Sequence, residues 1–416
     1  MPLLRAFIMT SIKYIYSILI CIILIFSVIS RGYSQVGLNI SYGTVLDGNA
    51  YRNYENLSDV IHEPQWSLFY NYPFEIGNIR FFYNGSAFLF DEFTTRRYFF
   101  HNIGVTGTWR SYESAPLMLW GIQGSRRFNQ DEYKYYDYDF LQGFLNFRFD
   151  KSTTKDWVLG AQLKYRNYKE LPEFSFLESN GFIRSSLFFR TRTTIITKIQ
   201  AGYKEFIEPV ESYEYIEEMD WGQSGRGNGR GKGGDTSDQS EVNDRLVQVE
   251  SAGSSVFQLF GSLRIAQSLA AKTGIALEAA VQRNPSGGVR VLSGQDSGYE
   301  TNDELYDDPY SYDMEEISLE ITQILPWSSR LKLGSSYTVK RYDRPVYDLE
   351  GNILEGILRR DTFPVTWVYL EKSFRIRGFS RSLQVYLQYQ HLNNDSNDEY
   401  YSYSNQIIGF GCSVTI

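Results

Sequence analysis

Cysteine and histidine are scarce in this chain of 416 residues. The two cysteines are Cys21, within an N-terminal apolar run, and Cys412; the three histidines are His62, His101 and His391. Removing the N-terminal run would leave one cysteine, so the pattern excludes a disulfide framework. No group of residues has the spacing of metal ligands. We therefore expect no metal, no cofactor and no catalytic residues.

Long apolar runs are missing beyond residue 29, which excludes a helical membrane protein because a spanning helix needs about 20 apolar residues. The N-terminus differs. Arg5 and Lys13 precede an apolar run over 14–29 and a polar stretch over 30–35, the order of a secretory signal peptide. We expect cleavage of residues 1–34 and a mature chain over 35–416. An uncleaved inner-membrane anchor is the alternative, since the run approaches spanning length.

An excess of positive charge is also lacking. The formal net charge is -8, which argues against a nucleic-acid partner because such proteins are normally basic. Aromatic residues, in contrast, make up 16% of the chain and include 33 tyrosines. Aromatic residues concentrate at the two interfaces of a membrane-spanning barrel. We assign Trp66, Trp109, Trp157 and Trp327 to strand ends, where such girdles would lie.

Apolar and polar residues alternate in segments of about ten residues along the mature chain. The first segment places Val36, Leu38, Ile40 and Tyr42 on one face. Similar segments begin near residues 66, 81, 103, 141, 157, 195, 257, 275, 317, 331, 383 and 408, and weaker ones cover 117–124, 183–190 and 362–372. Strands of soluble domains average five or six residues, whereas a tilted strand crossing a bilayer takes about nine to eleven. The pattern predicts an all-β chain forming one closed, transmembrane antiparallel β-barrel of about sixteen strands, with an error of about two.

The predicted links alternate between short and long, as in barrels with short periplasmic turns and long external loops. Short links fall near 75–78, 110–115, 150–156, 190–194, 266–271, 326–329 and 376–381. Long links fall near 47–63, 91–97, 127–137, 169–179, 207–253, 284–313, 343–361 and 393–402. Proline cannot donate to a ladder of hydrogen bonds, and we expect every proline of the mature chain to lie in a link or near a strand end.

These segments, from Val36 to the C-terminus, resemble the porin-like outer-membrane β-barrels in architecture. The resemblance implies an integral outer-membrane location, with outer-membrane lipid and lipopolysaccharide as partners and the barrel-assembly machinery as a partner during insertion. Such barrels commonly end in an aromatic residue that this machinery reads. The final strand over 406–416 departs from that pattern because it ends in Ile416. The oligomeric state stays open.

If the apolar faces contact lipid, the residues between them line the lumen. The predicted lumen charges are mostly positive: Arg80, Arg148, Lys164, Arg166, Lys198, Lys204, Arg264, Lys332 and Lys340 against Glu278 and Glu320. One interpretation is a channel whose cationic wall favours anionic solutes. The other is that these side chains form salt bridges across a filled barrel, since barrels of this size can be open or plugged.

The predicted external loops differ in composition. The longest, over about 207–253, holds a glycine-rich run over 222–234 and is expected to be a disordered surface loop; folding into the pore is the alternative. Other loops are acidic, notably 131–132, 303–308 and 395–399. Divalent cations could bridge these carboxylates to lipopolysaccharide, although a plain solvated surface is the simpler interpretation.

The leading function is a porin-like channel for passive or selective passage of small polar solutes, with anionic solutes as one option. A filled barrel that displays acidic loops to a partner is the second hypothesis. A surface hydrolase is the third, and it would need a histidine held between a carboxylate and a nucleophile. We expect the three histidines near the external strand ends and Cys412 on the lipid-facing side. A soluble secreted β-sandwich or propeller is the structural alternative.

Overall fold

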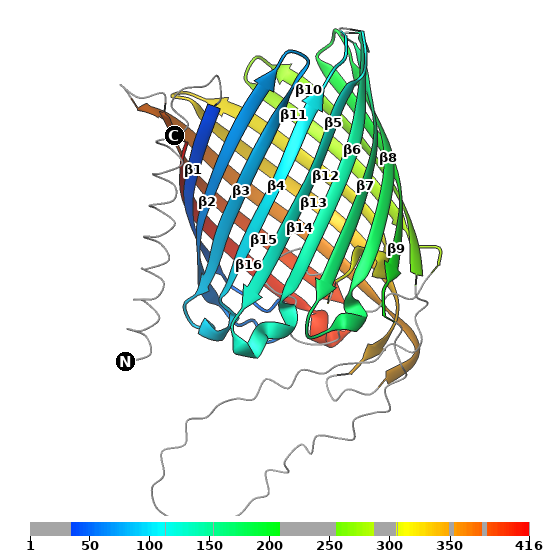
Figure 1. The fold of residues 1–416 in the computed structure, drawn as a ribbon. Helices are drawn as coiled ribbons and strands as arrows, with labels where there is room; N and C mark the ends of the chain where they lie inside the picture. Colours follow the sequence, from blue (N-terminus) through cyan, green and yellow to red (C-terminus); the bar gives the residue numbers. More distant parts are fainter. Residues whose placement is uncertain are drawn as a thin grey trace, which may run out of the picture.

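The chain folds into a closed antiparallel β-barrel of sixteen strands, in which each strand pairs with its neighbours in sequence and β1 pairs with β16 (Figure 1). The structure is a computed structural model that describes residues 35–112, 114–152, 154–208, 255–286, 305, 307–348, 353–376 and 381–415. The predicted fold class and strand number are confirmed. The predicted signal peptide over 1–34 and most of the glycine-rich loop over 207–253 lie outside the described residues.

The strands are long, as a tilted bilayer crossing requires. Their bounds are β1 Gln35–Asp47, β2 Asp59–Phe74, β3 Gly77–Phe90, β4 Tyr98–Trp109, β5 Leu117–Asn129, β6 Tyr138–Ser152, β7 Lys155–Tyr168, β8 Phe176–Phe188, β9 Thr193–Phe206, β10 Ser255–Ala270, β11 Thr273–Arg283, β12 Tyr312–Leu325, β13 Ser329–Tyr347, β14 Ile353–Ile376, β15 Arg381–Ser396 and β16 Tyr403–Thr415. Short 3-10 helices occupy the loops: η1 Thr94–Arg96, η2 Asp131–Tyr136, η3 Pro172–Phe174, η4 Pro309–Ser311 and η5 Glu399–Tyr401. Among the described residues, no helix is long and apolar enough to span a membrane.

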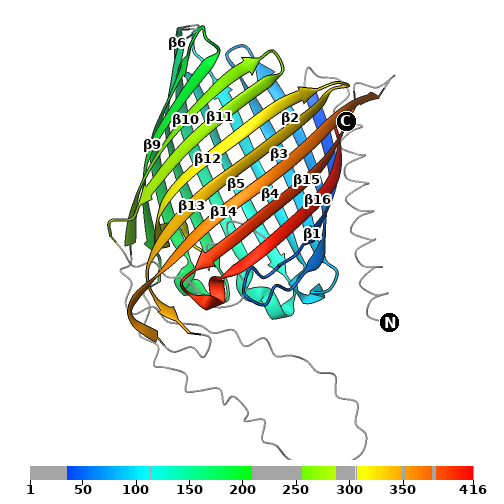
Figure 2. The same cartoon turned by 180° about the vertical axis from the view of Figure 1, so that it is seen from behind.

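Short turns gather at one end of the barrel, the turn end, and the longer loops with their 3-10 helices gather at the other, the loop end (Figures 1 and 2). The predicted alternation of links is confirmed. Two predicted loops are shorter than expected, because β2 already begins at Asp59 and β13 and β14 continue as a hairpin to Tyr347 and Ile353. This hairpin projects beyond the barrel at the loop end (Figure 2).

The prediction that no proline lies inside a strand is wrong for Pro64 and Pro364, which lie within β2 and β14. The hydrogen-bonding pattern adapts to both. Pro64 pairs with Tyr42 of β1, but the register between β2 and β3 skips it. Pro364 pairs with Tyr337 of β13, but the register between β14 and β15 skips it. Each proline therefore turns the side without an N–H toward a local gap in the ladder.

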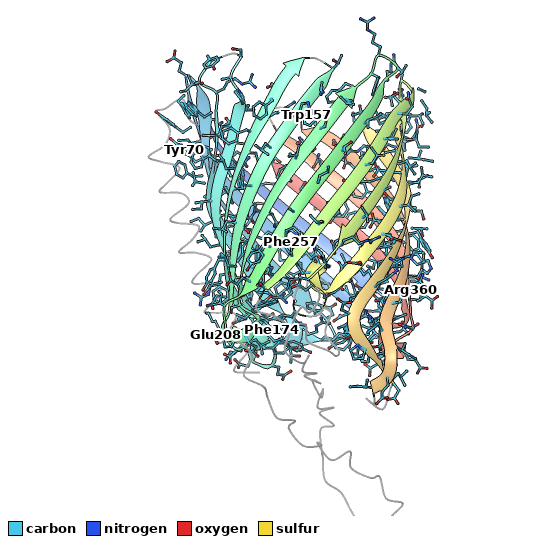
Figure 3. The ribbon with its side chains drawn as sticks, turned by 90° about the vertical axis from the view of Figure 1, so that its right-hand side faces the viewer. Tyr70, Trp157, Phe174, Glu208, Phe257 and Arg360 are labelled. Atoms are coloured by element: carbon cyan, nitrogen blue, oxygen red, sulfur yellow. The ribbon has the colours of Figure 1, made fainter. Side chains whose placement is uncertain are left out.

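The outer wall is apolar because every second residue of each strand points outward. Leu159, Leu277 and Leu387 are 49%, 46% and 50% exposed although they lie in strand centres. Aromatic residues flank them toward the turn end, where the exposed Trp157 and the half-buried Tyr70 lie (Figure 3). The predicted strand-end position of Trp66 is wrong. Trp66 lies inside β2 opposite Gly85 of β3, and its indole occupies the space that a Cβ at Gly85 would need.

Nitroxide spin labels test which solvent this wall contacts. We expect labels at positions 159, 277 and 387 of the protein in vesicles to be relaxed by oxygen dissolved in the acyl chains, because their side chains face outward. A label at Gln384, on the opposite face of β15, is the matched control and should respond to a water-soluble nickel complex instead. Equal shielding of the three outer positions from oxygen would contradict a lipid-facing wall.

Candidate functional site

All eleven predicted lumen residues lie on the inner face of the barrel, because each alternates along its strand with exposed outer-wall side chains. Arg264 and Glu278, for example, are directly opposed on β10 and β11, and their neighbours Leu263 and Leu277 are exposed on the outer wall. The others are Arg80, Arg148, Lys164, Arg166, Lys198, Lys204, Glu320, Lys332 and Lys340. Whether these residues line a solute path stays a prediction.

Many of these charges form ion pairs along the inner wall. Arg264 lies 3.0 Å from Glu278 and 3.5 Å from Glu320, and Glu320 lies 3.4 Å from Lys332. Further pairs join Lys164 to Glu178 at 2.9 Å and Arg148 to Asp156 at 3.1 Å. The excess of positive charge is thus smaller than the sequence predicts. Asp156 and Glu178 were missed because the expected links over 150–156 and 169–179 include both residues.

Arg184 and Lys198 take no part in the ion pairs found among the described residues. They are direct cross-strand neighbours on β8 and β9, on the inner face. Among the described residues, no carboxylate lies within ion-pair distance of either side chain, and the repulsion of Arg184 acts on Lys198. The Lys198 ammonium instead faces the rings of Phe182 and Phe260, at 5.3 and 5.4 Å from their centroids. Arg184 was missed by the sequence reasoning, although its alternation with the outward Ile183 would have identified it.

Solvent exposure varies along the inner wall. The side chains of Arg148 and Lys332, near the turn end, are 44% and 32% exposed, although Asp156 beside Arg148 is 9% exposed. The side chain of Lys204, near the loop end of β9, is 1% exposed. Protein segments therefore cover the inner wall around Lys204.

The loops at this end contact one another around the mouth. Arg96 of the β3–β4 loop donates to the Ala50 carbonyl of the β1–β2 loop at 3.2 Å, and its guanidinium lies 5.9 Å from the ring of Tyr133 in η2. The Lys169 amide in turn donates to the Asp137 carbonyl at 3.4 Å. These contacts link the first four loops, counted along the chain.

The β15–β16 loop joins these four loops, and we call the described set of five loops the loop ring. Arg359, on β14, lies 3.4 Å from the ring centroid of Tyr401 in η5. The Tyr54 amide donates to the Tyr400 carbonyl at 3.2 Å, which joins the last loop to the first. Contacts between loops of different hairpins fix their position over the mouth, because the contacts that each loop gains offset the conformational freedom that it loses.

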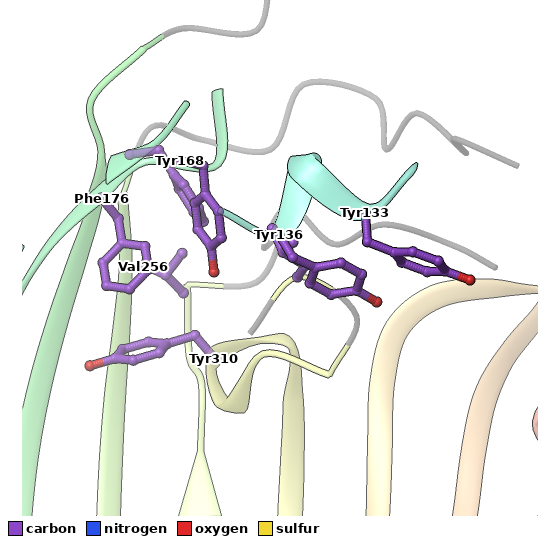
Figure 4. Packing of buried hydrophobic residues seen from close by; sticks show 8 residues of the cluster. Tyr133, Tyr136, Tyr168, Phe176, Val256 and Tyr310 are labelled. Atoms are coloured by element: carbon purple, nitrogen blue, oxygen red, sulfur yellow. The ribbon is translucent and has the colours of Figure 1, made fainter. Parts of the chain in front are cut away.

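A cluster of buried apolar side chains fills the loop-end lumen beside β7 to β10. Its members are Tyr133, Tyr136, Tyr168, Phe176, Phe206, Val256, Leu305 and Tyr310. Figure 4 shows Phe176, Val256 and Tyr310 turned toward one another, with the two tyrosines of η2 alongside. Leu305 and Tyr310 come from the described end of the β11–β12 loop. This end of the loop therefore folds inward and contributes to the apolar cluster.

We call the described residues of this inward segment, 305 and 307–311, the latch. Polar side chains of the inner wall hold its backbone, because the Pro309 carbonyl accepts hydrogen bonds from Gln258 at 3.0 Å, from Asn284 at 3.1 Å and from Gln282. Tyr310 reaches Asn180 of β8 at 3.4 Å. Asn180 lies four residues inside the loop end of β8, which places Tyr310 roughly 13 Å down the wall.

Two consecutive carboxylates anchor the latch to two separate strands, β9 and β13. Asp308 forms an ion pair with Lys204 of β9, and both side chains are 1% exposed. Asp307 forms an ion pair with Lys340 of β13 and accepts a hydrogen bond from the Tyr342 hydroxyl at 2.8 Å. Lys204 and Lys340, two of the predicted lumen residues, are both engaged by the latch, as the filled-barrel interpretation expects for this part of the wall. Asp307 and Asp308 also cannot serve as external ligands for divalent cations, as the acidic-loop hypothesis required.

Electrostatics keep Asp307 ionised. Burial alone would raise the pKa of its carboxyl group, but the charges of Lys340 and Arg359 and the Tyr342 hydrogen bond outweigh burial and hold the pKa below its ordinary value of 3.8. Among the described residues, no group of three or more His, Cys, Asp or Glu side chains could hold a metal ion.

The histidines lie on the outer wall, near the loop end as predicted. His62 Nδ1 lies 2.7 Å from the Tyr42 hydroxyl, and its Nε2 lies 3.4 Å from Asp91. His101 repeats the first contact with Tyr83 at 2.8 Å, and each histidine ring stacks on its tyrosine with centroids 6.1 Å apart. Because the same pair recurs on two neighbouring hairpins, an aromatic band explains it more simply than a catalytic site. Cys412, opposite Tyr42 and Val385, also faces outward.

No protein-family model matches the sequence, and no curated protein matches it. Solved structures that it resembles include OccK8 (OprE) of Pseudomonas aeruginosa, with a TM-score of 0.48 and 8% identity over 92% of this chain and 98% of that chain. OpdK of the same organism gives 0.48 and 8% over 92% and 99%. A loop-deletion mutant of OmpT, an outer membrane protein of Vibrio cholerae, gives 0.43 and 10% over 92% and 100%. The likeness is remote, so function has to be argued from the chain's own residues.

The buried pair of Lys204 and Asp308 gives a stability prediction. Lys204→Met should lower the free energy of unfolding by about 3–5 kcal/mol, because it leaves a carboxylate buried without its main partner. The double variant Lys204→Met with Asp308→Leu should recover most of this loss. Equilibrium unfolding in urea from lipid vesicles measures both. Strictly additive losses in the double variant would contradict a coupled pair.

The low pKa of Asp307 predicts how its contribution depends on pH. A carboxylate with a depressed folded-state pKa stabilises the folded state fully above its unfolded value, and this contribution is lost as the pH falls through the folded-state value. The difference in unfolding free energy between the wild type and Asp307→Asn should therefore be constant from about pH 8 to pH 5 and shrink only below about pH 4. A difference that already shrinks between about pH 7 and pH 5 would contradict the stated pKa direction.

Proposed function

We propose that this protein is an outer-membrane channel for small polar solutes, with a preference for anions. The observation that carries the proposal is the pair of inner-wall cations Arg184 and Lys198, which no carboxylate of the described residues compensates. Like charges placed directly opposite each other on neighbouring strands destabilise a sheet. The chain nevertheless keeps this pair while it compensates other inner-wall cations such as Arg264 and Lys164.

The surroundings of this pair suit an anion path. Phe182 and Phe260 flank Lys198 and limit its hydration, which strengthens the local positive potential. Arg184 is exposed inside the barrel. A fixed positive potential in a narrow aqueous passage concentrates anions and repels cations.

The outer wall supports the proposed location. Its apolar belt requires an acyl-chain environment, and the belt ends near the loop end in charged outward residues. Arg341 and Arg360 are outward neighbours on β13 and β14, and Arg360 lies at the loop end, near the projecting hairpin (Figure 3). In an outer membrane, these guanidinium groups would lie at the level of lipopolysaccharide phosphates, which arginine binds well.

The second candidate is a filled barrel that displays its loops to a partner, and the loop ring is the observation that favours it. A permanently closed mouth would make the inner charges structural. The two functions differ in one measurable property, because a structural barrel would pass no ions in planar bilayers whether or not Arg184 and Lys198 are present. The hydrolase hypothesis has weaker support, because the tyrosine–histidine pair recurs at His101, where the described residues place no carboxylate within ion-pair distance.

Single-channel recording in a salt gradient tests the leading proposal. Wild-type protein should give a reversal potential of the sign that indicates anion preference, and Arg184→Gln with Lys198→Gln should lower the anion-to-cation permeability ratio about threefold or more, since each removed charge lowers the local potential. Lys372→Gln is the matched control, because Lys372 pairs with Val385 on the outer face of β14 and β15. An equal effect of the control, or a cation preference in the wild type, would sink the proposal.

A further inference from the structure

We propose that the latch is an internal ligand: its two aspartates occupy a site formed by Lys204 and Lys340, and peptides with two consecutive acidic residues compete for this site and release the latch. This inference rests on the proposed channel function and specifies a solute class for it. The site lies in the loop-end lumen, where the latch fills part of the interior. Its chemistry also makes it a binding site.

The first argument is the geometry of the two lysines. They belong to β9 and β13, which are separated by three strands in the barrel, so one small carboxylate cannot contact both. Asp307 and Asp308 contact one lysine each from adjacent positions in the chain. A ligand for this site must therefore present two carboxylates on a short backbone, as an acidic dipeptide does.

The second argument is that side chains of the wall also bind the backbone that directly follows the two aspartates. Gln258, Gln282 and Asn284 all donate to the Pro309 carbonyl. Gln258 and Gln282 come from neighbouring strands and Asn284 follows β11. Gln282 and Asn284 also donate to the Tyr312 carbonyl at the start of β12. Side-chain amides that converge on peptide carbonyls in this way can hold a peptide backbone. The chemistry of the site thus matches acidic peptides better than inorganic anions.

The third argument is the position of the latch relative to the cation pair. Along β8 and β9, the inner-face pairs run from Glu178 and Lys204 through Asn180 and Gly202 and then Phe182 and Gln200 to Arg184 and Lys198. The latch covers the first two of these pairs, and the uncompensated cations lie two pairs further along. Release of the latch would connect this cation pair with the loop end.

Competition between a tethered and a free ligand sets the concentration scale. A segment on a short linker has an effective concentration of the order of millimolar at its own site. A free acidic peptide of equal affinity would therefore release the latch in the millimolar range and have little effect at micromolar concentrations. Such a response would suit a channel that opens when its solute is abundant.

Gly202 provides a variant that releases the latch without removing any charge. A Cβ at Gly202 would overlap both the Tyr310 hydroxyl and the Asn180 amide oxygen, so Gly202→Ala should displace Tyr310. Gly181 is the matched control on the neighbouring strand, because a Cβ there would meet nothing within 4 Å. Asp307→Asn with Asp308→Asn is a second releasing variant, in case the first folds poorly.

The reporter is a thiol on the latch. Leu305 is 1% exposed, so in a Cys21→Ser, Cys412→Ser background Leu305→Cys should react slowly with a membrane-impermeant maleimide added to the full-length protein in vesicles. Gly202→Ala and the double asparagine variant should each raise the labelling rate about tenfold or more. The first variant displaces the Tyr310 side chain, and the second removes the ion pairs with Lys204 and Lys340. Gly181→Ala should leave the rate unchanged. Unchanged labelling in both releasing variants would overturn the latch.

The ligand is tested with N-acetyl-Asp-Asp-amide against N-acetyl-Asn-Asn-amide. The acidic peptide at millimolar concentration should raise the labelling rate at position 305 of the Leu305→Cys variant, the neutral peptide should not, and Lys204→Met with Lys340→Met should abolish the peptide response. An equal response to both peptides, or none to either, would overturn the acidic-peptide site. Conductance separates this inference from the channel proposal: release without any conductance would sustain the latch and refute the channel, whereas anion conductance without a peptide response would do the reverse.

Discussion

The backbone hydrogen-bond requirement of a strand in hydrocarbon is the constraint on which this structure depends. Acyl chains offer no partners for N–H and C=O groups, so an open sheet edge would cost several kcal/mol for each unsatisfied group. The pairing of β1 with β16 removes the edge. Closure also determines where the side chains point, since alternate residues of each strand must face lipid and an enclosed interior. The two prolines inside β2 and β14 are tolerated because local gaps in the ladder receive them.

Because the outer face of the barrel is apolar, the charged side chains of the strands lie on the inner face, where they need partners. Most inner-wall charges find them on neighbouring strands, as Arg264 does with Glu278 and Glu320. Near the loop end the wall carries Lys204 and Lys340, and the partners come from a loop, through Asp308 and Asp307. The loop ring and the latch are thus consequences of the wall's charge pattern, and they are held in place by the aromatic residues that the loops contribute.

The sequence predicts the barrel well because alternation is a local signal. The outward Leu159 and Leu277 and the inward Lys164 and Glu278 follow from a period of two, with no knowledge of distant residues. Strand ends are less well determined, and this is why Glu178 was assigned to a link. The ion pairs of Asp307 and Asp308 could not have been predicted at all, because they join residues more than thirty and more than one hundred positions apart through a loop whose path depends on the folded wall.

The charged character of the latch has a physical meaning that an apolar plug would lack. A buried ion pair stabilises a fold no better than well-packed hydrophobic residues of similar volume, because desolvation offsets most of the Coulomb attraction. Charge does make the bound and released states closer in free energy, since Lys204, Lys340 and both aspartates regain hydration when they separate. An apolar plug, once released, would expose its surface to water at a cost that favours permanent closure. A plug held by carboxylates on lysines is therefore the chemistry expected of a closure that reverses.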